Sequence, residues 1–342
     1  EWGGGGVQTW PGARGSVAAG ARHRTGRWAA GLVLLAVGCS STEDSTADSG
    51  PQPSGDPAEL ASQVVARFPA EEATALAVDE DGQLFVGERL SGRVSKVDPD
   101  SGEAEALFTV DDLDTDLEQG GLLDLAIDTE GTLLVSYTAT DGHLVIDEVA
   151  GSPGKLTRRW DGPVAAERSN GGRLAVLGGD TAEQDTLVVG VGDLLDPESS
   201  PLPDTANGKL LVVNDSGEAS PFATGLNNPF ALGTDGKNTV WVADNAPGDN
   251  PERLLRLTAA RSEKVASWTD TRVPSGLAVL DDRTLAICYY ATGELVLVDA
   301  DNPQGGSGPL VADDCRFGVQ SLGDRRLAYA TDDEVVIVDV AG

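Results

Sequence analysis

The sequence predicts an all-β fold, a six-bladed β-propeller whose ring is closed by an N-terminal strand in the last blade. Three observations lead to this prediction. From residue 64 onward, an apolar strand, an Asp-Gly type of turn and a second apolar strand recur as a hairpin unit. The unit recurs about six times at spacings of roughly 45 to 57 residues, the range of propeller blades. Helical periodicity is absent from the same region, which favours sheets stacked radially around a channel.

Each copy opens with a short apolar strand that leads into the turn. In the first copy, Leu76-Ala77-Val78-Asp79 precedes Asp81-Gly82, and the second strand follows at 84–87. The later copies open at Leu125, Leu174, Ala231, Leu277 and Val319. A further apolar strand follows in each copy, at 94–97, 144–146, 210–213, 254–257, 295–298 and 335–338. A single unit of this kind cannot cover both of its faces, so neighbouring units are expected to bury one another.

The segment 64–68, Val-Val-Ala-Arg-Phe, is a strand without a hairpin of its own. We expect it to pair with the last copy, because this pairing closes the ring and removes an open sheet edge. The propeller domain is therefore expected to occupy residues 61–342.

The charge and the composition exclude several functions. The chain has 342 residues, with 24 Lys and Arg against 56 Asp and Glu, and its net charge is −32. Such a surface repels phosphate backbones, so nucleic acid is excluded as a partner. The chain holds only two histidines, which argues against a histidine-based triad and against a structural zinc site.

The first 38 residues are interpreted as a leader and a lipoprotein signal peptide. Arg22, Arg24 and Arg27 precede an apolar run at 28–38, which is too short to span a bilayer. The run ends at Cys39 after small residues, a pattern typical of a bacterial lipobox in which the cysteine is lipidated. Residues 39–60 are polar and read as a flexible tether. We therefore expect an extracytoplasmic protein, anchored by lipid alone to the outer face of the bacterial cell membrane.

Lipidation of Cys39 leaves Cys288 and Cys315 as an even pair. An extracytoplasmic location permits a disulfide between them. Two buried free thiols are the alternative.

The stretch 169–174, Ser-Asn-Gly-Gly-Arg-Leu, is the most informative motif, and it runs on to Gly190-Val191-Gly192-Asp193. Glycines at the start of a strand let the backbone approach a ligand or another backbone closely. Further motifs lie at 84–94, at 119–126 (Gln-Gly-Gly-Leu-Leu-Asp-Leu-Ala), at 207–210, at 225–229 and at 244–248. Together these motifs resemble the soluble sugar dehydrogenases that use pyrroloquinoline quinone (PQQ), which form the glucose/sorbosone dehydrogenase family. The resemblance spans about the whole of residues 64–340.

The resemblance implies a propeller that holds PQQ and calcium over its channel and oxidises an aldose at C1. The residues implied to contact the cofactor are Gln119, Asn227, Asn228, Arg316 and Arg173. The backbone carbonyls of Ala246 and Pro247 are implied to bind calcium, a hard cation that prefers oxygen ligands. For Arg173, a salt bridge at the end of a strand is the alternative role.

The chain departs from the family pattern at three positions. Ser169 stands where the family has its catalytic histidine, and a serine hydroxyl does not accept a proton at neutral pH without a partner. Asn227 replaces an arginine, and Asp314 stands near Arg316 where a second arginine is expected. Each reversed charge at about 4 Å costs on the order of 4 kcal/mol toward a tricarboxylate cofactor. Glu167 is the one substitute base that the sequence offers, so the catalytic residue is unknown.

The sequence leaves three functions open. The first is a PQQ-dependent sugar dehydrogenase, and the second is a non-catalytic surface lipoprotein that binds a sugar, a cell-wall carbohydrate or a protein. The third is a calcium-dependent hydrolase of the lactonase kind, for which carboxylates and amides converging on the channel could bind a metal ion. The candidates for that metal site are Asp124, Asp193, Asn228 and Asp244, with turn caps as their alternative role. In each case we expect a monomer.

Overall fold

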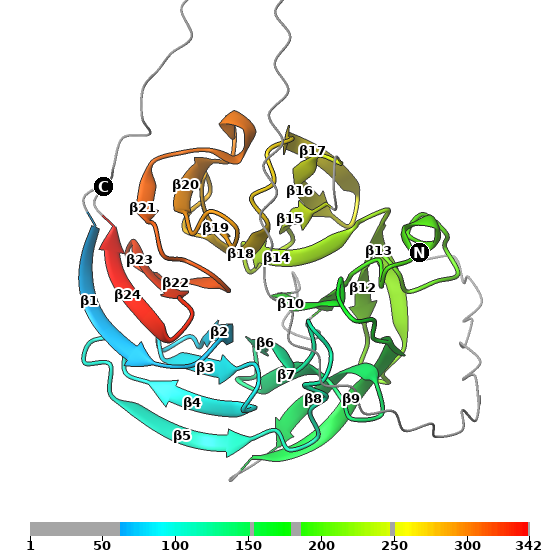
Figure 1. The fold of residues 1–342 in the computed structure, drawn as a ribbon, viewed down its shortest axis with the longest axis horizontal. Coiled ribbons are helices and arrows are strands. Elements are labelled where there is room, and N and C mark those ends of the chain that lie inside the picture. The colour runs from blue at the N-terminus through cyan, green and yellow to red at the C-terminus, as the bar shows by residue number, and fades with distance from the viewer. Residues whose placement is uncertain (1–61, 151–153, 179–185, 247–249, 341–342) are drawn as a thin grey trace, which may run out of the picture. The chain divides into compact units, whose positions relative to one another are not determined.

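The computed structural model describes residues 62–150, 154–178, 186–246 and 250–340. These residues form six four-stranded antiparallel sheets arranged in a ring (Figure 1). The prediction of an all-β, six-bladed propeller is therefore confirmed. The leader, the tether and the lipidation site Cys39 lie outside the described residues and remain predictions.

Blades 1 to 5 each contain four strands in chain order, from an inner strand at the channel to an outer strand at the rim (Figure 1). Blade 1 consists of β2 (Ala73–Val78), β3 (Leu84–Glu88), β4 (Arg93–Val97) and β5 (Ala104–Thr109). Blade 2 consists of β6 (Leu122–Ile127), β7 (Leu133–Thr138), β8 (His143–Ala150) and β9 (Lys155–Val164). Blade 3 consists of β10 (Gly171–Leu177), β11 (Thr186–Val191), β12 (Lys209–Val213) and β13 (Ala219–Thr224).

The second half of the ring follows the same plan. Blade 4 consists of β14 (Asn228–Thr234), β15 (Val240–Asn245), β16 (Glu252–Thr258) and β17 (Arg261–Trp268). Blade 5 consists of β18 (Pro274–Val279), β19 (Thr284–Tyr289), β20 (Leu295–Asp299) and β21 (Leu310–Ala312). Two 3₁₀ turns, at Pro197–Ser199 and Gln304–Gly306, are the helical elements among the described residues, and none of these elements is long or apolar enough to cross a membrane.

Blade 6 closes the ring with strands from both ends of the domain. It contains β22 (Val319–Gly323), β23 (Arg326–Ala330) and β24 (Glu334–Val340), and β1 (Ser62–Pro69) pairs antiparallel with β24 at its outer edge. The predicted closure by the segment 64–68 is confirmed. This strand covers the edge that β24 would otherwise expose.

The hydrophobic core lies between the blades rather than within them. Six clusters of buried apolar side chains each join two neighbouring blades. Between blades 1 and 2, for example, Ala75 and Val94 pack with Leu122 and Val135. Burial of this kind holds the inner strands at fixed positions around the axis, and those strands carry the candidate site.

Candidate functional site

The candidate site is a pocket of about 250 Å³ at the channel mouth where the inner strands begin. We call it the channel pocket. Its polar and aromatic lining residues come from all six blades and are Glu72, Thr74, Arg89, Glu118, Gln119, Asn170, Asn228, Phe230, Asn245, Ser275, Tyr290 and Phe317. Of the residues expected from the sequence, Gln119 and Asn228 line it.

The motif 169–174 forms the wall of the channel pocket in blade 3. Gly171 and Gly172 have φ angles of 69° and 89°, which side chains rarely tolerate. A Cβ atom on Gly172 would lie 2.4 Å from Leu123 of the neighbouring blade. The glycines are therefore needed for the strand to enter the channel this closely.

Gln119 and Asn228 are oriented by backbone donors of the same motif. Oε1 of Gln119 accepts a hydrogen bond from the Ser169 backbone N–H at 2.7 Å, and Oδ1 of Asn228 accepts from Gly171 at 3.1 Å. Because the side-chain oxygen of each amide accepts from a backbone N–H, the NH₂ group of each amide points away from that N–H. The NH₂ groups are thus the donors that these two side chains can offer to a ligand.

No proton acceptor stands at the position of the family's histidine in the described structure. Ser169 is half-buried with a φ of 63°, and it is not among the pocket-lining residues. Glu167 is exposed, its Oε1 accepts from the Glu118 backbone N–H at 3.2 Å, and it also lies outside the pocket lining. A general base must reach the reacting group within hydrogen-bond distance, and since neither residue lines the pocket, a catalytic role for either one stays a prediction.

Asn227 and Arg316 are engaged with other protein groups. The Asn227 side chain donates to Asp244, whose carboxylate is fully buried and also pairs with Arg253 at 2.7 Å. Nη1 of Arg316 donates to the backbone oxygen of Tyr290 at 2.8 Å. Neither Asn227 nor Arg316 lines the channel pocket.

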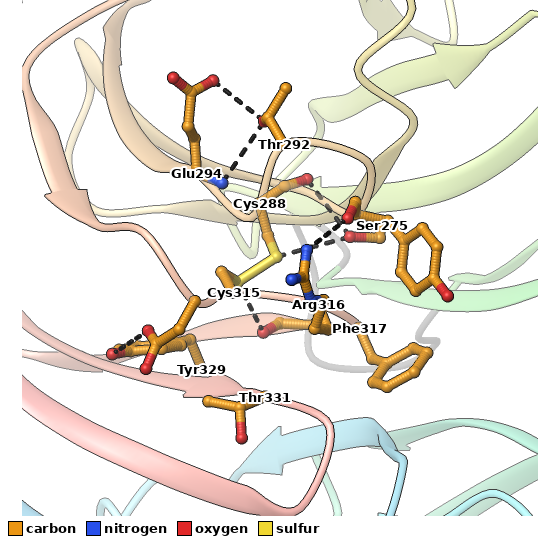
Figure 2. Close-up of a disulfide and its surroundings, with 12 residues drawn as sticks. Ser275, Cys288, Thr292, Glu294, Cys315, Arg316, Phe317, Tyr329 and Thr331 are labelled. Atoms are coloured by element: carbon orange, nitrogen blue, oxygen red, sulfur yellow. Dashed lines mark hydrogen bonds between the residues drawn. A yellow bond between two sulfur atoms is a disulfide. The ribbon is translucent and has the colours of Figure 1, made fainter.

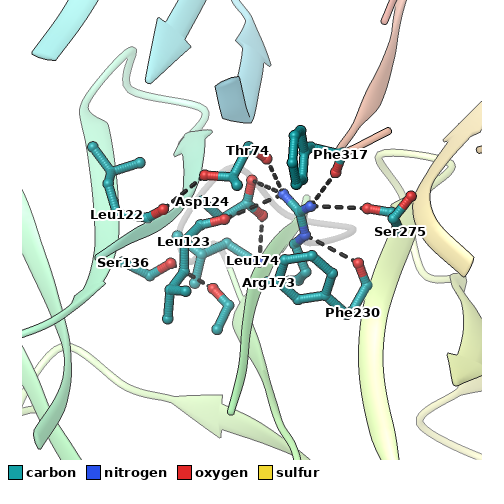
Figure 3. A network of polar contacts seen from close by, with 11 residues as sticks. Thr74, Leu122, Leu123, Asp124, Ser136, Arg173, Leu174, Phe230, Ser275 and Phe317 are labelled. Atoms are coloured by element: carbon teal, nitrogen blue, oxygen red, sulfur yellow. Dashed lines mark hydrogen bonds and ion pairs between the residues drawn. The ribbon is translucent and has the colours of Figure 1, made fainter. Parts of the chain in front are cut away.

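Arg173 makes the ion pair that the sequence left as its alternative role, with Asp124. It is 5% exposed and its guanidinium lies on the propeller axis (Figure 3). Its acceptors are the backbone oxygens of Thr74, Leu123, Phe230, Ser275 and Phe317 and the carboxylate of Asp124. A guanidinium has five N–H donors, and these acceptors occupy all of them. Arg173 therefore closes the channel and has no donor left for a cofactor.

The guanidinium separates the channel pocket from a second pocket of about 370 Å³ at the other ends of the inner strands. Asp124 and Arg173 form the inner end of that second pocket. Nη1 of Arg173 lies 3.3 Å from Oδ1 of Asp124, and Oδ2 accepts from the Leu174 backbone N–H at 2.7 Å.

We expect the pH dependence of stability to report on Asp124. Burial raises the pKa of its carboxyl from 3.8 to about 6, and Arg173 opposes this rise. Since the folded state binds the proton more tightly, the contribution of Asp124 to stability is full below pH 3.8 and is lost as the pH rises to about 6. As the pH rises through this window, the free energy of unfolding of Asp124→Asn should thus increase relative to that of wild type by up to about 3 kcal/mol. Urea unfolding at a series of pH values measures the difference, and parallel curves would contradict it.

A disulfide and an aromatic pair form the wall between blades 5 and 6. The structure joins Cys288 and Cys315 in a fully buried disulfide, which decides between the two states that the sequence left open (Figure 2). The adjacent Tyr290 and Phe317 line the channel pocket, with ring centroids 5.6 Å apart. Tyr290 is 45% exposed, an unusual state for a large aromatic ring.

The candidate metal ligands are bound to other protein groups, and the Asn228 backbone N–H itself donates to Oδ1 of Asp244 at 3.0 Å. Asp244 pairs with Arg253 and Asp124 with Arg173, while Asp193 accepts from the Leu195 backbone N–H. Within the described ranges, no group of three His, Cys, Asp or Glu side chains could hold a metal ion. Ala246 is buried, and Pro247 lies outside the described residues, so the expected calcium carbonyls stay a prediction.

Comparison with known proteins agrees with this architecture. The family model for glucose/sorbosone dehydrogenase matches residues 70–244. No curated protein sequence matches the chain. The PQQ-bound aldose sugar dehydrogenase from Streptomyces coelicolor superposes with a TM-score of 0.69 at 19% identity, covering 84% of this chain and 100% of its own. The apo aldose sugar dehydrogenase from Escherichia coli superposes with a TM-score of 0.64 at 16% identity, covering 82% of this chain and 99% of its own.

The fold and the channel pocket thus define a six-bladed propeller of the sugar dehydrogenase type. The chain belongs to the glucose/sorbosone dehydrogenase family. Because the identity to these solved structures is low, their likeness shows the fold alone.

The pocket does not fit a tricarboxylate cofactor. Its charged lining residues are Glu72, Glu118 and Arg89, and Nε of Arg89 already pairs with Glu72 at 2.7 Å. A PQQ trianion would meet an excess of negative charge, which repels it at short range. Arg173 and Arg316 are bound elsewhere, and exposed Arg168, whose Nη1 lies 3.8 Å from Glu118, is the nearby arginine that offsets part of this charge.

Sequence reasoning missed several residues of the pocket, including Glu72, Glu118, Asn245, Tyr290 and Phe317. Most of them lie on turns at the ends of strands, where no periodicity marks them. The backbone carries a different signal, since Glu72, Ser169 and Val273 around the mouth all have positive φ angles. Strain at non-glycine residues tends to gather at functional sites.

Proposed function

We propose that the protein binds a neutral sugar in its pyranose form in the channel pocket. One observation carries the proposal, namely that the pocket has two chemically different sides. Phe230 of blade 4, Tyr290 of blade 5 and Phe317 of blade 6 contribute the aromatic side. Gln119 of blade 2 and Asn170 of blade 3 lie on the opposite side of the pocket, because blades 2 and 3 face blades 5 and 6 across the channel.

A pyranose ring matches such a pocket. Its C–H faces pack against aromatic rings, whose faces carry partial negative charge. Its hydroxyl groups donate and accept at the ring edge, where amide and carboxylate side chains are suitable partners. The exposed ring of Tyr290 and the NH₂ groups of Gln119 and Asn228 supply both kinds of contact.

The charge of the pocket favours a neutral ligand. Glu72 and Glu118 outnumber Arg89, so an acidic sugar or a phosphorylated sugar would be repelled. The overall charge of −32 acts in the same direction.

PQQ-dependent oxidation of an aldose is the second candidate function, and membership of the family favours it. The family's cofactor would supply the oxidising chemistry. The acidic lining, the serine at position 169 and the occupied arginines argue against it in this chain. We therefore expect no reduction of a redox dye when the protein is given PQQ, calcium and glucose.

Calorimetric titration tests sugar binding. We expect methyl β-glucoside or N-acetylglucosamine to bind with a dissociation constant on the order of 1 mM or tighter, which corresponds to about 4 kcal/mol. Tyr290→Ala should weaken binding about fivefold to tenfold, because it removes the stacking surface. Leu202→Ala is the matched control, since Leu202 is 49% exposed and does not line the pocket.

Two outcomes would reject the proposal. The first is the absence of any binding across a panel of neutral hexoses, pentoses and N-acetylated sugars. The second is tight binding of PQQ together with steady dye reduction, which would establish the second candidate instead.

We also propose that the protein acts outside the cytoplasm, anchored through Cys39. The disulfide supports this location, because such bonds persist mainly in oxidising compartments. An outer-face location would place the pocket where cell-wall carbohydrate and external sugars are found.

A further inference from the structure

The inner strands of five blades are irregular at one recurring position. Each pairs regularly with the second strand of its blade except for a gap near its start. The gap includes Thr74 in β2, Leu123 in β6, Arg173 in β10, Phe230 in β14 and Ser275 in β18. An irregularity of this kind frees the residue from the ladder and re-aims its backbone groups.

The freed backbone oxygens meet on the axis. Those of Thr74, Leu123, Phe230 and Ser275 all accept from Arg173, at 2.8 Å for Ser275, 3.0 Å for Phe230 and 3.2 Å for Leu123 (Figure 3). Blade 6 supplies the oxygen of Phe317 just before β22. The guanidinium therefore touches every blade other than its own.

This arrangement differs from an ordinary buried salt bridge. Asp124 accounts for one contact of the guanidinium, at 3.3 Å, whereas five backbone oxygens account for the rest. A salt bridge alone needs no irregularity in the strands. Oxygen atoms converging from several chain segments, with one carboxylate among them, are the usual surroundings of a bound cation.

We propose that the propeller axis is a cation site built from these backbone oxygens, and that the chain fills it with its own guanidinium. The planar guanidinium suits the site because its donors spread in one plane toward acceptors on all sides. The face of Phe230 adds a further contact, with its ring centroid 4.1 Å from Cζ of Arg173. Removal of the side chain should then leave a site that takes up a free cation from solution.

Chemical rescue of Arg173→Ala tests the proposal. The melting temperature of this variant is measured in guanidinium chloride at low millimolar concentration and in sodium chloride at the same ionic strength. We expect guanidinium to raise it by about 2–4 °C in a saturable manner, as a ligand of the folded state does. Wild type should show no rise, because its site is full. Calcium chloride is run in parallel, and a rise specific to calcium would also show a cation site.

Two variants control the interpretation. Arg173→Lys keeps a tethered cation, so it should fold and show no rescue. Arg261→Ala removes an exposed arginine, 70% accessible at its side chain, and should respond as wild type does. If Arg173→Ala does not fold in sodium chloride, its refolding yield with and without guanidinium is compared. The absence of a cation-specific gain in both melting temperature and refolding yield would overturn the proposal.

Discussion

Replacing Arg173 with methionine is expected to lower the free energy of unfolding by about 3–5 kcal/mol, the usual cost of removing one partner from a buried charge pair. Methionine keeps much of the side-chain volume, so the loss reports on polar contacts. At neutral pH the substitution leaves the Asp124 carboxylate buried without its cation and five backbone oxygens without their donors. Urea unfolding at pH 7 measures the change.

Two further variants make this expectation specific. Arg261→Met removes an exposed arginine whose partner Glu263 is partly exposed, and the change should stay within about 0.5 kcal/mol. Asp124→Asn combined with Arg173→Met should recover part of the loss, since the stranded carboxylate is gone. An Arg173→Met protein as stable as wild type would show that water satisfies the axis as well as the guanidinium does.

The inner three strands of the blades could be predicted because they are apolar on both faces. In β6 and β7, for example, nearly every residue is buried between neighbouring blades. The outer strands β5, β13 and β17 were missed, because they are exposed and polar and carry no strong alternation. Pairing with the third strand holds them in place, and this is a tertiary effect that local sequence does not carry.

The candidate site was predictable in part for a similar reason. Gln119 and Asn228 sit beside glycine motifs that can be seen in the sequence, and the structure brings both to the channel pocket. Arg173 belongs to a third glycine motif, 169–174, but its role depends on oxygens from five other blades, which no local pattern reveals. Tyr290 was missed because a single aromatic residue on a turn carries no signal until its neighbours are known.

Loss of the disulfide is the second change expected to have a large effect. Replacing Cys288 and Cys315 together with alanine should lower the free energy of unfolding by about 3 kcal/mol, because the bond restrains a loop with a sequence separation of 27 in the unfolded chain. The bond also ties the end of β19 to the segment that carries Arg316 and Phe317 (Figure 2). Sugar affinity should therefore fall as well, since Tyr290 and Phe317 lose part of their support.

The effect of the covalent link can be separated from the effect of lost volume. When wild type is unfolded in urea with a reducing agent, the disulfide is broken but both sulfur atoms remain. Its free energy of unfolding should then fall by most of the amount lost in the double alanine variant. In the native state the same reagent should act slowly, because both cysteines are fully buried. Equal stability of oxidised wild type and the double variant would mean that packing between blades 5 and 6 alone holds this wall of the pocket, and sugar affinity should then be unchanged too.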